Sequence, residues 1–252
     1  MSTPAASGSL KKRLNDIESF DLAAGRKLAR KYVVGELLGD GWEGEVYLVT
    51  ESSTGIERAA KFFFPKRNPR NRAIKFYARK LNKLRDCSIV IKYHTQESFR
   101  HCGQEIPFLI SEYVEGELLT DFIARQPGKR LHPFEALHLL RDITAGVEEI
   151  HNLGEYHGDL HSDNIIVNRV GLGFQVKLVD LYHWGRPTAA HFHDDVCFLI
   201  RLLYDAVGGQ KHYAKQPREI KEICCGLKRS LIIRKFRTAG HLRQYLEKLE
   251  WS

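Results

Sequence analysis

The sequence lacks a hydrophobic run long enough to cross a membrane, since none approaches the roughly 18 consecutive apolar residues that a transmembrane helix needs. Near its N-terminus it also lacks the apolar core of a secretory signal peptide. Its five cysteines are odd in number and scattered, and no two form a CxxC pair, so neither a disulfide framework nor a zinc site is indicated. These absences predict a cytoplasmic protein without a membrane span.

Negative charge is scarce in one stretch of the chain. Residues 61–92 contain eleven Lys or Arg side chains and a single acid, Asp86, whereas the whole chain carries a moderate net charge of +8. A moderate net charge is typical of an ordinary solvated surface, so nucleic acid is not an expected partner. The local excess of positive charge predicts a docking surface for a regulatory partner, which we call the Lys61–Lys92 surface.

The chain is long enough to bury one good hydrophobic core or two small ones, since it has 252 residues of which 43% are apolar. Residues 2–9 are rich in Ser, Ala, Gly and Pro and predict a disordered tail. Residues 10–31 alternate charged residues with Leu at near-helical spacing and predict a short helix. We therefore expect a partly disordered N-terminal extension over residues 1–30.

Two acids and an amide are expected to meet near one loop. Gly158 ends a helical pattern, and residues 165–167 form an apolar strand, so Asp159 and Asn164 lie on the loop between them. A second apolar strand ends at Asp180, and a glycine-containing hairpin would return this acid to Asn164. Mg²⁺ prefers such oxygen ligands, which leaves Asp159 as a candidate base. Any single Asp in a loop is more often a turn residue, so the interpretation depends on the combination.

Three glycines separate two strand patterns between residues 32 and 49. The GxGxxG spacing of Gly39, Gly41 and Gly44 also occurs in dinucleotide-binding folds, but there a helix follows. Here residues 45–49 alternate as a strand. The glycines therefore predict a β-hairpin whose backbone N–H groups can approach phosphate oxygens closely.

The next strand, residues 58–64, has a single lysine inside an apolar run. A lysine in mid-strand usually lies on the solvent face, so the position of Lys61 in this strand does not by itself indicate a function. Further along, periodicity and turn signals predict a helix at 71–84, a strand at 88–93, a strand beginning at 108, and helices at 133–153, 195–205, 217–228 and 238–249.

In this order, the motifs resemble those of the protein-kinase superfamily, and the resemblance covers Tyr32 to about Leu249. It implies an α+β, two-lobed protein-kinase-like fold. The N-lobe, residues 31–116, would be a small antiparallel β-sheet with one helix. The C-lobe, residues 117–252, would be reduced and mainly helical. The resemblance also implies ATP and Mg²⁺ as cofactors.

The resemblance assigns roles to individual positions. Asp159 matches the catalytic base, and Lys61 matches the strand lysine that grips the α- and β-phosphates. Asn164 and Asp180 match the two metal ligands, and Asn164 also belongs with Asp159 and Lys61 among the catalytic residues. Asp195 matches the acid that braces the backbone of the catalytic loop.

A longer set of positions matches the nucleotide-binding residues of the family. In the resemblance, Glu112 and Val114 meet adenine through their backbones and Glu117 meets the ribose. The full implied set is Gly39, Gly41, Gly44, Val46, Ala59, Lys61, Glu112, Val114, Glu117 and Ile166.

One departure from the family pattern concerns the partner of Lys61. In the family, the first helix of the N-lobe carries a Glu that pairs with the strand lysine. No Glu occurs here between Glu57 and Glu97, and the matching position falls near Tyr77. Lys61 would then be oriented by Asp180 alone or by an acid from elsewhere, and a weak or inactive enzyme becomes conceivable.

Other departures concern regulation. Gly158 stands where kinases that are switched on by loop phosphorylation carry an Arg, and His161 stands where Ser/Thr kinases carry a Lys. Only fourteen residues separate Asp180 from Asp195, without an Ala-Pro-Glu motif, and Thr188 is the only Ser or Thr among them. We therefore expect a short activation segment and an enzyme that is active as translated.

The sequence thus predicts an ATP- and Mg²⁺-dependent phosphotransferase, with a Ser/Thr protein kinase acting on a protein hydroxyl as the preferred function. One alternative is a small-molecule or saccharide kinase with a hydroxyl acceptor, since aminoglycoside and choline kinases share the His-Gly-Asp-Leu-His wording. Their acceptor helices are usually long insertions, however, and this C-lobe is too short to hold them. The other alternative is a nucleotide-binding pseudokinase that serves as a scaffold.

Overall fold

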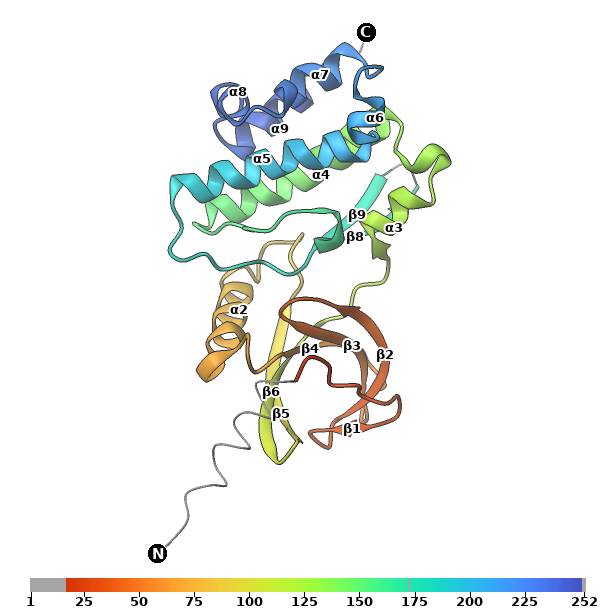
Figure 1. The fold of residues 1–252 in the computed structure, drawn as a ribbon, viewed down its shortest axis with the longest axis vertical. Coiled ribbons are helices and arrows are strands. Elements are labelled where there is room, and N and C mark those ends of the chain that lie inside the picture. The colour runs from red at the N-terminus through yellow and green to blue at the C-terminus, as the bar shows by residue number, and fades with distance from the viewer. Residues whose placement is uncertain (1–16, 172, 251–252) are drawn as a thin grey trace, which may run out of the picture. The chain divides into compact units, whose positions relative to one another are not determined.

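The computed structural model describes residues 17–171 and 173–250, and its fold is α+β (Figure 1). These residues form two compact units. Unit 1 comprises the described residues up to 82 together with 91–114, and unit 2 comprises 83–90 together with the described residues from 115 onward. The tail expected at residues 2–9 lies outside the described residues. Within the described ranges, no helix is long and apolar enough to span a membrane.

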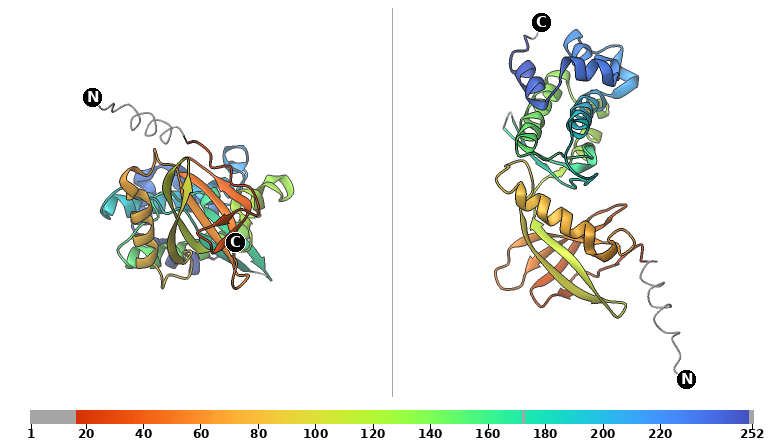
Figure 2. Two further views of the ribbon diagram at one scale, coloured as in Figure 1. Left: turned by 90° about the horizontal axis from the view of Figure 1, so that it is seen from below. Right: turned by 90° about the vertical axis from the view of Figure 1, so that its left-hand side faces the viewer.

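Unit 1 is built on an antiparallel sheet whose strands follow the order β1, β2, β3, β4, β6, β5. Helix α2, Arg72–Lys83, lies along this sheet (Figure 2), and its Tyr77 ring lies 6.1 Å from the Phe63 ring of β4. A short 3-10 turn, η1 at Pro69–Asn71, precedes α2. The strands are β1 Lys27–Leu28, β2 Tyr32–Asp40, β3 Gly44–Glu51, β4 Glu57–Phe63, β5 Tyr93–His101 and β6 Gln104–Glu112.

Aromatic rings fill the core of unit 1. Phe62 on β4 stacks on Phe108 of β6 with 4.8 Å between the ring centroids, and it meets Phe99 of β5 edge-to-face at 5.3 Å. All three side chains are buried. Because aromatic side chains are large and pair in preferred geometries, this cluster fixes the alignment of three neighbouring strands.

The short helix predicted over residues 10–31 is wrong for its described part. Residues 17–31 contain no helix, and they run along the sheet and include β1. Phe20 is only 2% exposed, and its ring centroid lies 5.6 Å from that of Phe64 and 5.7 Å from that of Phe62. Burial of this ring in the core outweighs the weak local preference for a helix. The part of the prediction before residue 17 lies outside the described residues.

A buried carboxylate holds the Phe20 segment on the sheet. Glu45 on β3 accepts hydrogen bonds from the Ser19 hydroxyl at 2.7 Å and from the Phe20 amide at 3.1 Å. It also accepts one from the Tyr47 hydroxyl at 2.8 Å, and the Leu22 amide donates to that hydroxyl at 3.3 Å. Burial, together with the hydrogen bond to Glu45, raises the pKa of Tyr47 to about 12.

Unit 2 is mainly helical. Its longest helices, α4 at Pro133–Asn152 and α5 at Ala189–Ala206, run side by side (Figure 1). Pro133 begins α4, where a missing N–H costs nothing, and the His132 ring accepts a hydrogen bond from the Phe134 amide at 3.3 Å. The other helical segments are α3 Leu119–Ala124, η2 Pro127–Lys129, η3 Ser162–Asn164, α6 Gly209–Tyr213, α7 Arg218–Cys224, η4 Cys225–Leu227, α8 Arg229–Lys235 and α9 Ala239–Glu247.

A small antiparallel sheet completes unit 2. Its strands are ordered β7 at Glu117–Leu118, β8 at Ile165–Val170 and β9 at Gly173–Leu178. Strands β8 and β9 form the predicted hairpin, with Ile165 opposite Leu178. This pairing brings the residues that follow β9 back to the beginning of β8.

The strand predicted at residues 88–93 is wrong. Strand β5 begins only at Tyr93, and Val90 makes a single isolated bridge to Leu178. The apolar run has another physical origin, because Ile89 packs against α4 so closely that a Cβ on Gly146 would lie 2.4 Å from it. A short apolar run predicts burial more reliably than it predicts a strand.

Candidate active site

The glycine-rich hairpin of unit 1 joins β2 to β3. Gly39 lies opposite Val46, and the Gly41 amide donates to the Gly44 carbonyl at 3.0 Å. Gly44 is sterically required, because an added Cβ would lie 1.8 Å from the carbonyl oxygen of Phe62. At Gly39 and Gly41, an added Cβ would meet nothing within 4 Å beyond its chain neighbours. Packing among the described residues therefore explains one of the three predicted glycines.

Lys61 on β4 lies opposite Val46 of β3 and is only 6% exposed. Its Nζ lies 3.3 Å from Oε2 of Glu43 and 4.8 Å from the centre of the Tyr77 ring. Tyr77 on α2 therefore lies beside Lys61, where the family resemblance expects a Glu. Glu43, an acid of the glycine-rich hairpin, contacts Lys61 within unit 1. Sequence reasoning did not identify Glu43, although the lack of acids on α2 left either Asp180 alone or an acid from elsewhere to orient Lys61.

The residues predicted to meet adenine lie at the end of β6 and just beyond it in unit 1. Ala59 of β4, another residue of the implied set, lies opposite the buried Ser111 of β6. The Glu112 amide donates to the Lys92 carbonyl at 2.8 Å, and the Glu112 carboxylate accepts from the Lys92 amide at 3.0 Å. Val114 is half-buried and is the last residue of unit 1. Unit 1 thus carries the predicted nucleotide-binding residues from Gly39 to Val114.

Unit 2 carries the two remaining predicted nucleotide contacts. Ile166 on β8 lies opposite Leu118 of β7. Glu117, the neighbour of Leu118, accepts a hydrogen bond from Nε of Arg125 at 2.9 Å. The Glu117 carboxylate is therefore already engaged, and a ribose hydroxyl would have to share it with Arg125.

A buried acid organises the predicted catalytic loop, residues 157–164. Asp195 on α5 accepts hydrogen bonds from the backbone amides of His157 at 2.7 Å and Gly158 at 2.9 Å, as predicted. The His151 ring contacts the same carboxylate at 3.0 Å. Burial alone would raise the pKa of Asp195, but the hydrogen bond from His151, the charge of His157 and the Gly158 amide outweigh burial and lower this pKa below its ordinary value. Asp195 therefore stays ionised beneath the loop.

The predicted base and metal ligands of unit 2 lie on neighbouring stretches of backbone. The side-chain amide of Asn164 donates to the Asp159 carbonyl at 2.8 Å, and it lies 3.4 Å from the Asp159 carboxylate. The backbone amide of Val179 donates to the Asn164 carbonyl at 3.0 Å, so Asp180 follows one residue beyond this contact. Asp180 has a φ of +54°, in the left-handed region that non-glycine residues seldom adopt. The side chain of Asp159 is 52% exposed.

These residues suit a hard cation such as Mg²⁺. The side-chain nitrogen of Asn164 donates to Asp159, so the side-chain oxygen of Asn164 points away from Asp159. Asp180 brings a carboxylate, because it follows Val179, whose backbone amide donates to the Asn164 carbonyl. Among the described residues, no cluster of three or more His, Cys, Asp or Glu side chains could hold a metal ion. A cation bound by Asn164 and Asp180 would need further oxygens from a phosphate or from water, which is the coordination that Mg²⁺ usually takes.

The segment after Asp180 is tied to the catalytic loop by contacts that sequence reasoning missed. The indole N–H of Trp184 donates to the Gly158 carbonyl at 2.9 Å. The buried Tyr156 hydroxyl accepts from the Trp184 amide at 2.7 Å and donates to the Gly185 carbonyl at 3.0 Å. Gly158 has a φ of +85°, and an added Cβ would lie 2.9 Å from the Tyr156 ring. The glycine at this position is therefore required by local packing.

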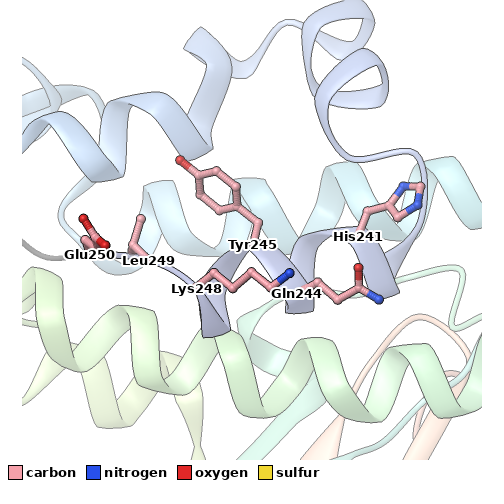
Figure 3. Close-up of a pocket in the computed structure, with 6 residues that line it drawn as sticks. All are labelled: His241, Gln244, Tyr245, Lys248, Leu249 and Glu250. Carbon is pink, nitrogen blue, oxygen red and sulfur yellow. The ribbon is translucent and has the colours of Figure 1, made fainter.

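A separate hollow of about 530 Å³ lies along α9 in unit 2 (Figure 3). The Tyr245 hydroxyl in its wall accepts a hydrogen bond from Lys235 at 3.3 Å, so this side chain also holds neighbouring helices together. The hollow is not part of the predicted site, because its lining residues are His241, Gln244, Tyr245, Lys248, Leu249 and Glu250.

Comparison with curated proteins places this chain near known kinases. It is 30% identical over 179 residues to myosin light chain kinase 3 of Pongo abelii, a match that covers 71% of this chain and 20% of that protein. It is 30% identical over 158 residues to a probable serine/threonine-protein kinase of Streptomyces coelicolor, covering 62% and 23% of the two chains. It is 28% identical over 169 residues to the serine/threonine-protein kinase PrkC of Bacillus subtilis, covering 66% and 24%. The matched part is thus a quarter or less of each relative.

A solved structure supports the fold. The chain resembles the crystal structure of the Mycobacterium tuberculosis PknI kinase domain, a double mutant, with a TM-score of 0.60 and 19% sequence identity. The similarity covers 90% of this chain and 96% of that one. The protein kinase domain family itself matches residues 32–194, which is more than half of the sequence. This chain therefore belongs to the protein kinase domain family.

Proposed function

We propose that this chain is an ATP- and Mg²⁺-dependent phosphotransferase that acts on the Ser or Thr hydroxyl of a protein substrate. The observation that carries the proposal is the hydrogen-bonded cluster of unit 2, in which Asn164 contacts Asp159 through its side chain and the residue before Asp180 through its backbone. This arrangement offers one exposed carboxylate as a base and two oxygen ligands for a cation. The serine/threonine-protein kinases among the relatives support a protein acceptor.

In the proposed reaction, Asp159 orients the acceptor hydroxyl and takes its proton as the hydroxyl oxygen attacks the γ-phosphorus of ATP. The bond between the γ-phosphorus and the bridging oxygen breaks, and ADP leaves with that oxygen. Lys61 binds oxygens of the α- and β-phosphates through its ammonium group. Mg²⁺ held by Asn164 and Asp180 would neutralise charge on the phosphates. The chain thus contributes mainly positioning and charge neutralisation.

We also propose that the enzyme is active without phosphorylation of the segment after Asp180. Kinases that need such a phosphate use a basic pocket beside the catalytic loop to bind it. Here Gly158 brings no charge, and its carbonyl accepts the Trp184 indole N–H instead. The Tyr156 hydroxyl supports the same interpretation, because it accepts a hydrogen bond from the Trp184 amide and donates one to the Gly185 carbonyl of this segment. The segment can therefore be held in place by neutral hydrogen bonds.

A regulatory partner is proposed for the Lys61–Lys92 surface. The basic side chains on the unit 1 part of this surface are largely exposed, and the sequence from residue 58 to residue 85 contains no acid. A partner that presents several carboxylates or phosphates would be attracted to this surface. Its exposed members in unit 1 are Lys66, Arg70, Arg72, Lys75 and Arg79, whereas Lys61 and Lys80 are buried.

A transfer assay with γ-labelled ATP and Mg²⁺ tests the proposed function. Purified chain is offered a mixture of protein acceptors, a saccharide set and an aminoglycoside set, and label transfer is measured for each class. We expect label on Ser or Thr of protein, loss of transfer in Asp180→Asn, and normal transfer in the matched control Asp86→Asn, whose side chain is 84% exposed. Transfer to saccharide or aminoglycoside alone would contradict the protein acceptor. Nucleotide binding without transfer to any class would contradict the enzymatic function.

A further inference from the structure

Lys61 is a buried cation that needs an anion close by. Its side chain is only 7% exposed. Burying an ammonium group is unfavourable unless a carboxylate or another strong acceptor compensates for the lost water. Helix α2 packs its buried face near Lys61 without offering any acid, because residues 58–85 contain neither Asp nor Glu. The compensating carboxylate in unit 1 must therefore come from another element.

Glu43 supplies that carboxylate from the glycine-rich hairpin. Its Oε2 lies 3.3 Å from Nζ of Lys61. Its backbone carbonyl accepts a hydrogen bond from the Phe64 amide at 2.9 Å, immediately after the strand that carries Lys61. The main chain of the next residue, Gly44, lies so close to Phe62 that no Cβ fits. These backbone contacts set the distance between Glu43 and β4.

Tyr77 fills the space on the α2 side of Lys61 with a ring. The Nζ atom lies 4.8 Å from the centre of the Tyr77 ring and 5.3 Å from that of Phe63. Aromatic faces attract a cation, but a neutral ring does so more weakly than a carboxylate and defines the position of the ammonium group less sharply. Of the Glu43 carboxylate and these two rings, Glu43 is therefore the stronger determinant of where the Lys61 ammonium lies.

We propose that Glu43 is the positioning residue that orients Lys61 toward the phosphates of ATP, in place of an acid on α2. This inference rests on the proposed function, because it assumes that Lys61 binds phosphate. The glycine-rich hairpin then has a second role, beside the predicted approach of its backbone to the phosphates. The hairpin that covers the phosphates also carries the carboxylate that orients the lysine, so a displaced hairpin weakens both contacts together.

The first test measures the affinity of a fluorescent ATP analogue for Glu43→Gln, with Glu36→Gln as the matched control. Glu36 is an exposed acid on β2, one of the two strands of the same hairpin. We expect the dissociation constant to rise about tenfold or more in Glu43→Gln, because a misoriented cation loses much of its Coulombic contact with phosphate. The control should bind as the wild type does. An unchanged or tighter dissociation constant in Glu43→Gln would overturn the proposal, the tighter value indicating that Glu43 competes with the phosphates.

A double-mutant cycle with Lys61→Met separates orientation of the lysine from a general structural role. If Glu43 acts through Lys61, then Glu43→Gln causes no further loss of affinity once Lys61 is already Met. Equal losses in the two backgrounds would contradict the proposal. Thermal unfolding of each variant confirms that the compared proteins are folded.

A rescue variant completes the test. Tyr77→Glu places a carboxylate on α2 beside Lys61, so the double variant Glu43→Gln/Tyr77→Glu should recover most of the lost affinity and, in the transfer assay, most of kcat/KM. Failure of this rescue, in a folded double variant, would contradict the assigned role. If the wild type binds no nucleotide at all, the proposed function fails together with this inference. If the wild type binds nucleotide and Glu43→Gln binds equally well, only this inference fails.

Discussion

The two units hold their parts of the candidate site by different physical means. In unit 2, the buried Asp195 carboxylate accepts two successive backbone amides, and Asn164 joins the loop to the strand that leads to Asp180. In unit 1, the Lys61 ammonium contacts the Glu43 carboxylate of a hairpin and the rings of Phe63 and Tyr77. The unit 2 part depends on hydrogen bonds with fixed backbone partners, whereas the unit 1 part depends on the attraction between the Glu43 carboxylate and the Lys61 ammonium.

This difference explains why the acid that braces the loop, Asp195, follows the family pattern while the partner of Lys61 departs from it. A carboxylate that accepts two neighbouring amides must lie at one place, and an uncharged or longer side chain cannot replace it without leaving a buried donor without an acceptor. An ammonium group has three donors on a flexible stem and accepts an anion from several directions. The acid that serves Lys61 can therefore move from a helix to a hairpin while the strand lysine stays in place.

The largest expected effect is on catalysis in unit 2. Asp180→Asn should lower phosphoryl transfer by about a thousandfold or more, because it would remove a carboxylate from the proposed Mg²⁺ site. Transfer rates at saturating Mg²⁺ measure this effect. The variant should unfold at nearly the temperature of the wild type. Transfer that stays close to the wild-type rate would remove Asp180 from the site.

The next effect is on stability in unit 2. Asp195→Asn should lower the free energy of unfolding by about 3 kcal/mol, because one of the two amide donors then faces an NH₂ group instead of an oxygen. Urea titration at neutral pH measures the loss. A loss smaller than the one expected for Glu45→Gln in unit 1 would show that the loop does not depend on the Asp195 carboxylate.

The stability gap between wild type and Asp195→Asn should also depend on pH. The pKa of Asp195 is lowered in the folded protein, so its carboxylate stabilises the fold above the unfolded value of about 3.9, and this contribution disappears as the pH falls through the folded pKa. The gap should therefore narrow below about pH 4. A gap that stays constant between neutral and acidic pH would contradict the assigned cause.

A smaller effect is expected for the buried acid of unit 1. Glu45→Gln should cost about 1 to 2 kcal/mol, because the amide oxygen keeps some of the hydrogen bonds from Ser19, Phe20 and Tyr47 while its NH₂ group displaces others. The backbone amides of Phe20 and Leu22 should exchange faster with deuterium. Unchanged exchange at both positions would show that burial of the Phe20 ring holds the segment without help from Glu45.

The smallest expected effect is at Thr188. This residue is the only Ser or Thr between Asp180 and Asp195, and its side chain is exposed. Thr188→Ala and phosphatase treatment should each leave the transfer rate nearly unchanged, because Trp184 and Tyr156 already hold the segment. A large loss of activity that both treatments share would show that a phosphate on Thr188 is needed.

Much of the fold could be predicted from the sequence because its signals are local. The glycine-rich hairpin, the β8–β9 hairpin and helices α2, α4 and α5 each carry their own periodicity or turn residues. The described part of the helix predicted over residues 10–31 and the strand predicted at 88–93 were wrong for the same reason. Phe20 and Ile89 are buried by tertiary packing, and no local pattern distinguishes such burial from regular structure.

The site could be predicted where residues follow a motif of fixed spacing, but not where it depends on contacts between residues without such a spacing. The spacing of Asp159, Asn164 and Asp180 was sufficient to expect the hydrogen-bonded neighbourhood in unit 2. The contact between Glu43 and Lys61 joins the turn of the glycine-rich hairpin to β4, and many acids in the sequence could have made it. The same holds for Trp184, whose indole reaches the Gly158 carbonyl only because the chain turns back on itself.

The central claim, that the unit 2 cluster catalyses phosphoryl transfer, is tested most directly by measuring kcat and the dissociation constant for ATP in Asp159→Ala. A base acts mainly in the transition state, so kcat should fall by about a hundredfold to ten-thousandfold while the affinity for ATP stays close to that of the wild type. A fall in ATP affinity with kcat preserved would contradict the account, because Asp159 would then support the loop without taking part in the reaction.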